Sequence, residues 1–330
     1  MGAKRIFLNG CAWSAVFFVA AVLLSCSNGA EKAEGEVSKN RVVKVKNLGR
    51  SLAFEKAPER AVALNQHTTE MMLALGLEDS MVGTAYLDDQ VLPELQEGYK
   101  QVPVLSDQYP SQEVFLSVEP DFAYAGWKSA FREDHVGTMK ELKSFGIHAY
   151  LHQASNVTNP TVEDVFQGIS NIGRIFRVES KADDLIHSMK KEMKQTQSKV
   201  GEVDQPIRVF VYDSGETAPF TAGGNFLSHL ITLAGGENIF SDIEKNWTEV
   251  NWEAVVDRNP EMIVIMDYGD VTVSQKRNIL LNHPALADVD AIKNERFVVL
   301  PLSAGAPGIR APDTLETLAK HFYPEKFKEK

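Results

Sequence analysis

The stretch EVFLSVEPDFAYA at residues 113–125 decides the fold, because a counterpart lies later in the chain. Residues 253–265 read EAVVDRNPEMIVI, so each copy holds a glutamate, an apolar helical turn, a Pro-acid pair and a β-rich run. A second echo pairs LGLED at 75–79 with AGGEN at 234–238. Either echo alone is compatible with two ordinary αβ units. Two echoes in the same order favour an internal duplication.

Strand and helix patterns alternate around both copies, which predicts a mostly parallel sheet covered by helices on both faces. Strands are expected at 61–64, 81–86, 121–125, 147–151, 207–212, 262–267 and 296–300, and helices at 68–75, 111–118, 138–145, 225–234, 252–257 and 313–322. Thr68 is expected to cap the first helix and Gly76 to end it. The segment VVKVKN at 42–47 is a candidate edge strand.

A helical stretch separates the two αβ regions. Apolar residues recur at helical spacing over 162–176, after the capping signal TVED at 161–164. A second helix follows Ser180 and extends to about Val200, a length of roughly 30 Å. We therefore expect an α/β fold with two similar lobes of mostly parallel, Rossmann-like sheets, joined by one long interlobe helix. The expected boundaries are 42–160 for the N-terminal lobe, 161–203 for the helical connection and 204–330 for the C-terminal lobe.

The N-terminus is typical of an export signal. Residues 1–25 contain Lys4 and Arg5 and then a long apolar run, which ends in LLSC at 23–26. That ending resembles a bacterial lipobox, in which the cysteine, here Cys26, receives a diacylglycerol. An uncleaved membrane anchor is the alternative, but the run is short for a span of roughly 20 residues. We expect a protein anchored by lipid to the bacterial cell membrane, facing outside the cytoplasm, with 26–41 as a flexible tether.

Composition narrows the classes of function. The formal charge is −11, and removal of residues 1–25 would make it −13, which argues against nucleic acid as a partner. One cysteine would remain after cleavage, so neither an intrachain disulfide nor a thiolate metal cluster is expected.

The order of several motifs resembles the ABC-transporter substrate-binding proteins for cobalamin, iron-siderophores or haem, the type III periplasmic binding proteins. The motifs are APERAVAL at 57–64, EPDF at 119–122, AGGENIF at 234–240, NPEMIV at 259–264 and LAK at 318–320 with YPE at 323–325. AGGENIF is the most specific block, and the order of the motifs carries more weight than any one of them.

The resemblance implies a non-catalytic, monomeric receptor with no cofactor of its own. It would capture a chelated metal, such as a ferric siderophore, haem or cobalamin, and deliver it to an ABC permease dimer with its ATPase. Family members close only slightly, and each lobe presents one glutamate to the permease. These glutamates map onto Glu113 and Glu253, with Glu249 as a rival for the second position.

Aromatic residues near strand ends are the first ligand candidates, because ligands of open α/β sheets bind beyond the carboxyl ends of the strands. Tyr86, Trp127, Phe220 and Trp247 match positions where cobalamin-binding relatives place aromatics. Flat rings suit a corrin, porphyrin or catechol face. Packing within the lobes is the alternative for each of them.

Charged residues could set the type of ligand. Arg132 and Arg310 are candidates to clamp an anionic ferric chelate, since guanidinium pairs well with carboxylate; a surface salt bridge is the alternative. His67 is a candidate for direct contact with metal. His148, His152, Glu70 and the Asp88-Asp89 pair add possible ligands, but a bare-metal receptor needs several that converge, so chelated metal is preferred.

Two other classes of function stay open. An extracellular hydrolase is disfavoured, because the chain lacks Gly-x-Ser-x-Gly and Ser214 has no identifiable histidine partner. A ligand-sensing lipoprotein that reports its ligand rather than delivering it would share every residue of the cleft.

Overall fold

A computed structural model describes residues 42–328. The predicted signal peptide at 1–25, the lipidation site Cys26 and the tether at 26–41 lie outside the described residues. Among residues 42–328, no helix combines the length and the apolar character that crossing a membrane would require.

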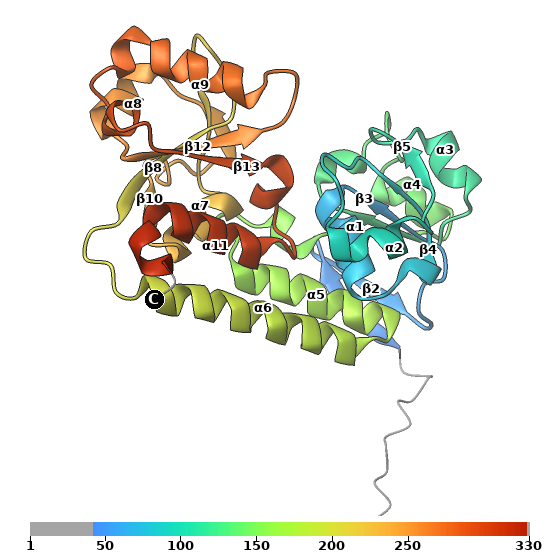
Figure 1. The fold of residues 1–330 in the computed structure, drawn as a ribbon. Helices are drawn as coiled ribbons and strands as arrows, with labels where there is room; N and C mark the ends of the chain where they lie inside the picture. The colour runs from blue at the N-terminus through green and yellow to red at the C-terminus, as the bar shows by residue number, and fades with distance from the viewer. Residues whose placement is uncertain (1–41, 329–330) are drawn as a thin grey trace, which may run out of the picture. The chain divides into compact units, whose positions relative to one another are not determined.

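The N-terminal lobe is built on a five-stranded sheet in which all pairings are parallel (Figure 1). Its strands, in the spatial order β5-β4-β3-β6-β7, are β3 (Ala61–Leu64), β4 (Met81–Ala85), β5 (Val104–Ser106), β6 (Phe122–Ala125) and β7 (His148–Leu151). Its helices are α1 (Gln66–Ala74), α2 (Gln96–Tyr99), α3 (Gln112–Ser117) and α4 (Met139–Ser144). Separate clusters of buried apolar residues cover the two faces of the sheet, as expected for parallel strands.

The C-terminal lobe repeats this architecture. Its parallel sheet has the order β10-β8-β12-β13, with β8 (Ile207–Tyr212), β10 (Gly236–Asn238), β12 (Met262–Asp267) and β13 (Phe297–Pro301). Its helices are α7 (Phe226–Leu233), α8 (Trp252–Arg258), α9 (Val273–Asn282), α10 (Asp290–Lys293) and α11 (Ala311–Phe322). A small antiparallel pair, β9 (Phe220–Ala222) and β11 (Trp247–Glu249), stands apart from the sheet.

Short 3-10 turns connect these elements. They are η1 (Glu78–Ser80), η2 (Pro93–Leu95), η3 (Lys128–Ala130), η4 (Gln153–Asn156), η5 (Pro284–Leu286), η6 (Leu302–Gly305) and η7 (Pro324–Phe327).

The order β4-β3-β6-β7 in one sheet corresponds to β10-β8-β12-β13 in the other. Both copies of the Pro-acid motif are held in the same way. Arg60 Nε donates to the Glu119 carbonyl at 2.8 Å, and the Asp121 carboxylate accepts the Arg60 backbone N–H at 3.0 Å. Arg208, Asn259 and Glu261 repeat these two contacts at 2.8 and 3.1 Å. The predicted pair of similar lobes with parallel sheets is therefore confirmed, down to the hydrogen bonds of the repeat.

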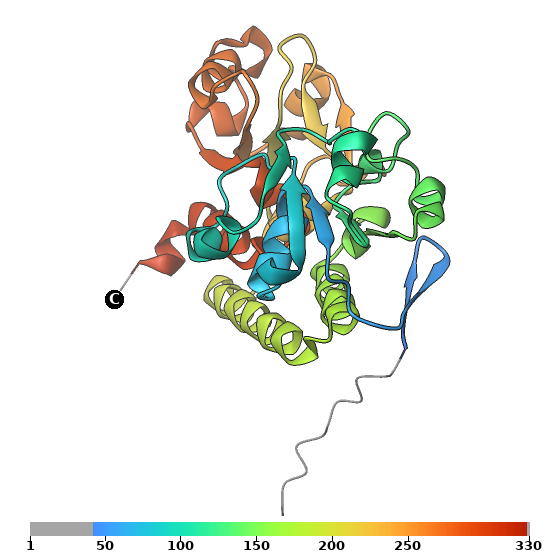
Figure 2. The same ribbon diagram turned by 90° about the vertical axis from the view of Figure 1, so that its right-hand side faces the viewer.

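The helical connection consists of α5 (Val162–Phe176) and α6 (Glu179–Val200). The N–H and hydroxyl of Thr161 both donate to Asp164 Oδ2 at 2.9 Å, which caps α5 as the sequence predicts. The two helices lie side by side, with α6 passing below both lobes (Figures 1 and 2). A Cβ on Gly173 would lie 2.5 Å from Cβ of Ala182, so only glycine permits this close packing.

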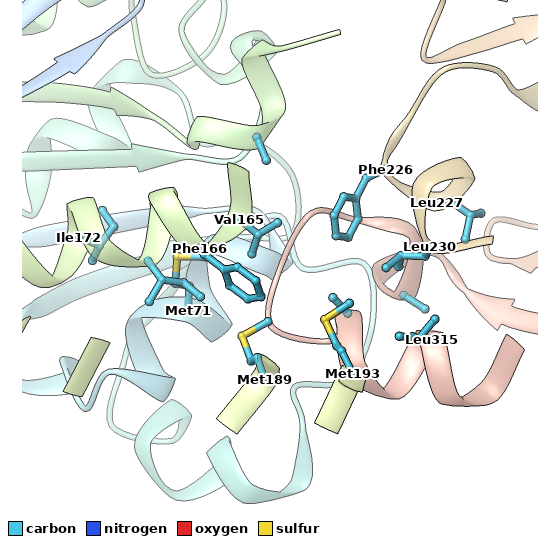
Figure 3. Close-up of a cluster of buried hydrophobic side chains, with 14 of the residues drawn as sticks. Met71, Val165, Phe166, Ile172, Met189, Met193, Phe226, Leu227, Leu230 and Leu315 are labelled. Carbon is cyan, nitrogen blue, oxygen red and sulfur yellow. The ribbon is translucent and has the colours of Figure 1, made fainter. Parts of the chain in front are cut away.

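A single apolar core runs from one lobe to the other through these helices. Figure 3 shows Phe166 of α5 beside Met189 of α6, and Met193 close to Phe226 and Leu315 of the C-terminal lobe. Met71 of α1 belongs to the same buried cluster. The lobes are thus joined by packed side chains as well as by the chain itself.

The edge strand expected at 42–47 is present as β1 (Val43–Asn47), which pairs antiparallel with β2 (Arg50–Phe54) in a separate two-stranded hairpin with a tight turn at 48–49. One local prediction is wrong. Thr68 does not cap α1; its hydroxyl donates to the Leu64 carbonyl at 2.8 Å, and Asn65 occupies the cap position with a φ of 91°.

Candidate ligand-binding cleft

A cavity of about 300 Å³ lies beyond the carboxyl ends of strands from both lobes. Its lining comprises His67, Asp88, Trp127, Ala154, Ser155, Pro160, Asn225, Phe226, Asn246, Trp247, Leu302, Gly305, Ala306 and Pro307. Asp88 also lines a more open groove of about 1000 Å³ on the N-terminal lobe, so the cavity and the groove meet at this residue. The position agrees with the strand-end rule used on the sequence.

The wall contributed by β3 and β6 depends on a glycine. A Cβ on Gly126 would lie 2.3 Å from Cε1 of His67 and 3.0 Å from Cβ of Asn65. Without that Cβ, the imidazole of His67 packs against the Trp127 ring, with 5.0 Å between centroids. Gly126 therefore lets these two predicted ligand residues share one wall.

His67 is 4% exposed, and burial lowers its pKa to about 4. Its ring lies 5.4 Å from the His152 ring, and burial also lowers the pKa of His152. Both imidazoles are consequently neutral near pH 7. Nε2 of His67 is buried and has no hydrogen-bond partner among the described residues. No group of three or more His, Cys, Asp or Glu in the described part of the chain is arranged to hold a metal ion, so direct metal contact by His67 stays a prediction.

The four predicted aromatics separate into two pairs. Trp127 and Trp247 both line the cavity and come from different lobes. Phe220 does not line it; its ring stacks on Trp247 at 6.4 Å and 14°, and the residue begins β9 rather than lying in a loop. Tyr86 also lies outside the lining and packs edge-on against Tyr109 at 4.5 Å.

Neither predicted arginine lines the cavity. Arg132 is exposed and forms two hydrogen bonds of 2.9 Å with Asp134. Arg310 forms a bidentate pair with Glu70, at 2.8 and 2.5 Å, and also donates to the Gln90 carbonyl. The cavity lining therefore does not support the prediction that Arg132 and Arg310 clamp an anionic ligand. Arg310 joins the two lobes, because Glu70 belongs to α1 and the arginine precedes α11.

Further residues at the cavity were not among the predicted ligand contacts. Asn225 caps α7, accepts the Ser228 N–H and donates to the Asn246 carbonyl at 3.0 Å, which places Phe226 at the cavity wall. Asp88 was considered only as a possible metal ligand. Its position in the sequence, three residues after the end of β4, is the signal that could have identified it as a residue of the cavity.

Asp88 is open to solvent at the mouth of the cavity. Partial desolvation by the surrounding protein raises the pKa of Asp88 to about 6, and the nearby negative charge of Asp89 adds to this effect. Tyr268 of the C-terminal lobe is within electrostatic range of Asp88, and its hydroxyl donates to Asp213 Oδ2 at 2.6 Å. Asp88 therefore places a carboxylate at the mouth of the cavity.

The family described as periplasmic binding protein matches residues 62–304, most of the chain. This chain belongs to that family. Periplasmic binding proteins bind substrates and are not enzymes, so the family agrees with a cleft for binding.

Individual members of the family can be compared with this periplasmic binding protein. It is 26% identical over 325 residues to YvrC of Bacillus subtilis, an uncharacterized ABC transporter substrate-binding lipoprotein, across 96% of this chain and 98% of YvrC. It is 25% identical over 214 residues to a vitamin B12-binding protein of Vibrio parahaemolyticus, across 64% and 73% of the two chains. The crystal structure of a periplasmic binding protein from Veillonella parvula is similar with a TM-score of 0.80 and 34% identity, covering 86% and 98%.

The two predicted docking glutamates of this binding protein occupy equivalent places. Glu113 is the second residue of α3 and Glu253 the second residue of α8. Both helices have a side-chain cap, from Ser111 and Asn251 respectively. Both glutamates are exposed, and neither has a hydrogen bond or ion pair within residues 42–328. Two unpaired carboxylates are thus displayed by the duplicated element, one in each lobe.

Proposed function

We propose that this protein is an extracytoplasmic substrate-binding lipoprotein of an ABC importer. It captures a metal chelate of the iron-siderophore, haem or cobalamin type and delivers it to the permease. The observation that carries this proposal is the pair Trp127 and Trp247, which line one cavity from two lobes. The near full-length similarity to a substrate-binding lipoprotein and the partial similarity to a vitamin B12-binding protein support it.

The cavity has a suitable chemistry for a flat, partly apolar ligand. Two indole rings, Phe226 and two prolines supply apolar area, while Asn225, Asn246 and Ser155 offer hydrogen bonds. A volume of about 300 Å³ is at the lower end of the range for small-molecule sites. A larger chelate would place one face in the cavity and extend past Asp88 into the open groove.

The permease would be contacted through the two glutamates. Charge-assisted pairing of carboxylate with arginine is strong and directional, so one glutamate per lobe can engage both halves of a permease dimer. A lipid on Cys26 would keep the receptor at the membrane, since each buried methylene of an acyl chain contributes about 0.8 kcal/mol. The receptor would act as a monomer.

A binding screen tests the substrate class. Purified protein is titrated with cobalamin, haem, and hydroxamate and catecholate ferric chelates, with quenching of tryptophan fluorescence as the signal. We expect micromolar or tighter binding of at least one chelate. Trp127→Ala and Trp247→Ala should each bind it at least tenfold more weakly, because each variant loses a large aromatic contact surface. A tenfold change corresponds to about 1.4 kcal/mol of binding free energy. Arg132→Ala is the control, because its side chain is exposed, is paired with Asp134 and does not line the cavity. Binding of sugars or amino acids but of no chelate would contradict the proposal.

A further inference from the structure

The charges around the cavity are unevenly distributed. Among the described residues of its lining there is no arginine or lysine, and Asp88 is the one carboxylate. His67 is the other ionisable residue there, and burial keeps it neutral by lowering its pKa to about 4. Near pH 7 the lining therefore contributes negative charge alone.

Three basic residues of the two lobes are bound to protein partners. Two others, Lys128 and Lys245, adjoin the lining residues Trp127 and Asn246 in sequence but are exposed and do not line the cavity. Arg310 is paired with the buried carboxylate of Glu70, so it cannot turn toward a ligand without leaving that charge unpaired. Lys276 is 1% exposed, and its ammonium donates to the carbonyls of Met266 and Tyr268 at 2.6 and 3.3 Å. Arg132 is bound to Asp134 on the surface. These interactions leave none of the three available to neutralise an anion.

Asp88, in contrast, has no hydrogen bond or ion pair within the described range 42–328. The titratable groups coupled electrostatically to Asp88 are Asp89 from its own loop, Tyr109, and Tyr268 from the other lobe, and none of them is a cation. The nearby indoles of Trp127 and Trp247 present electron-rich faces, which attract cations and not anions.

From this arrangement we infer that the cleft selects neutral or cationic chelates and discriminates against anionic ones, with Asp88 as the residue that sets the preference. The inference rests on the proposed function and specifies its substrate class. An anionic chelate would lose hydration in an aromatic-lined cavity without gaining a cationic partner, and would be repelled by Asp88. A cationic chelate gains both the carboxylate and the indole faces.

The test uses chelates that share a scaffold and differ in charge. The first series is a linear ferric trishydroxamate with a free amine (cationic), its N-acetyl form (neutral) and its N-succinyl form (anionic). The second is cyanocobalamin (neutral) and its side-chain monocarboxylic acid (anionic), and haem is added as an anionic chelate. Affinities are measured calorimetrically for the full-length mature protein, for Asp88→Asn and for Asp184→Asn. The last variant removes an exposed carboxylate of α6 that forms no hydrogen bond or ion pair within residues 42–328.

We expect the anionic member of the bound series to bind at least about tenfold more weakly than its neutral member, a difference of about 1.4 kcal/mol. Asp88→Asn should weaken the cationic chelate about three- to tenfold, change the neutral one less than about twofold and strengthen the anionic one. Asp184→Asn should change none of them by more than about twofold.

The two ways of failing are distinguishable. If anionic members bind as tightly as neutral ones, if haem binds most tightly of all, or if Asp88→Asn behaves like Asp184→Asn, the charge inference is overturned while the proposed function stands. If no chelate of any kind binds, the proposed function fails, and the inference fails with it.

Discussion

Trp127 and Trp247 line the same cavity although 120 positions separate them in the sequence. Their arrangement depends on small local features rather than on the tryptophans themselves. Gly126 makes room for the His67 ring, and the stacked ring of Phe220 supports Trp247. Changes at these supporting residues should therefore affect binding even where the supporting residue does not touch the ligand.

Gly126→Ala tests this dependence at the residue scale. The new methyl group would overlap the His67 ring, which is buried and packed against Trp127, so the ring must move. We expect a loss of about 1–3 kcal/mol in the free energy of unfolding, typical of overpacking, together with weaker chelate binding. Denaturant unfolding and fluorescence titration measure the two effects.

Gly98→Ala in α2 is the matched control, because a Cβ there meets its nearest neighbour at an ordinary 3.4 Å. It should leave binding unchanged and stability equal or slightly higher, since alanine favours helix. Equal effects of the two substitutions would show that the contact between Gly126 and His67 is unimportant.

The pH dependence of binding is a second prediction at this scale. The pKa of Asp88 is raised to about 6, mainly through partial desolvation by the surrounding protein. Its carboxylate therefore becomes charged as pH rises through that value. His67 stays neutral over the same range, because its pKa is lowered to about 4. Affinity for a cationic chelate should consequently rise between about pH 5 and about pH 8.

The same titration with Asp88→Asn should be flat, and a neutral chelate should show little dependence on pH with either protein. A rise that persists in Asp88→Asn would assign the titration to a group other than Asp88. Tyr109 and Tyr268 do not titrate in this range, because burial raises the pKa of each above its ordinary value.

At the scale of elements, α1 and the N-terminus of α11 are connected by the buried pair of Glu70 and Arg310. The Glu70 side chain is 1% exposed and that of Arg310 is 14% exposed. Glu70 also accepts hydrogen bonds from Gln66 Nε2 and the Leu92 N–H, and nearby Asp89 accepts the Ser303 N–H at 2.9 Å. Two segments of the C-terminal lobe are thereby attached to the N-terminal lobe, one to α1 through Glu70 and one to the following loop through Asp89.

Arg310→Met should be strongly destabilising, because it leaves the buried Glu70 carboxylate without its partner. A loss of about 3–5 kcal/mol in the free energy of unfolding is expected, as for other broken buried pairs. Adding Glu70→Gln should recover part of this loss by removing the unpaired charge. Chemical denaturation of the single and double variants measures both changes.

Arg132→Met supplies the control, since the exposed pair with Asp134 should contribute only about 0–1 kcal/mol. Similar small losses for both arginine variants would contradict the assignment of Arg310 as a structural link between the lobes.

The sequence could predict the elements better than the orientation of single residues. Apolar periodicity identified α5 and α6, and the repeated Pro-acid motif identified the twin sheets, because these patterns reflect burial that recurs along the chain. The strand-end rule located His67 and Trp127 near the cavity. Tyr86 satisfied the same rule, yet it packs against Tyr109. Arg310 lies in a Gly-Pro-rich loop after a strand, yet it pairs with Glu70, and a partner 240 positions away leaves no local pattern. Thr68 was predicted as the cap because threonine is a common N-cap residue, but Asn65, which is equally suited to that position, occupies it.

At the scale of the whole described protein, the continuous core through α5 and α6 opposes large movement of the lobes. Separating the lobes would expose Met189, Met193 and Phe226, each of which contributes roughly 1.5–3 kcal/mol when buried. The link between Glu70 and Arg310 adds to this coupling. We therefore expect Glu113 and Glu253 to keep a nearly fixed spacing whether or not ligand is bound.

The docking prediction belongs to this scale. Glu113→Ala combined with Glu253→Ala should abolish uptake of the chelate by cells while leaving affinity for the ligand within about twofold, because neither side chain lines the cavity. Radiolabelled uptake and calorimetry measure the two properties separately.

Glu133→Ala combined with Glu237→Ala is the control, since it also removes one exposed glutamate from each lobe. Normal uptake by the docking variant, or equal loss by the control, would remove the proposed role of the two helix-start glutamates.

The most direct measurement is a crystal structure of the mature protein with the chelate that binds most tightly in the screen. The account predicts a single chelate between the lobes, in contact with both Trp127 and Trp247, with its bulkier part directed past Asp88 into the open groove. A chelate bound to one lobe alone, or a ligand elsewhere on the protein with the cavity between the tryptophans left empty, would contradict it.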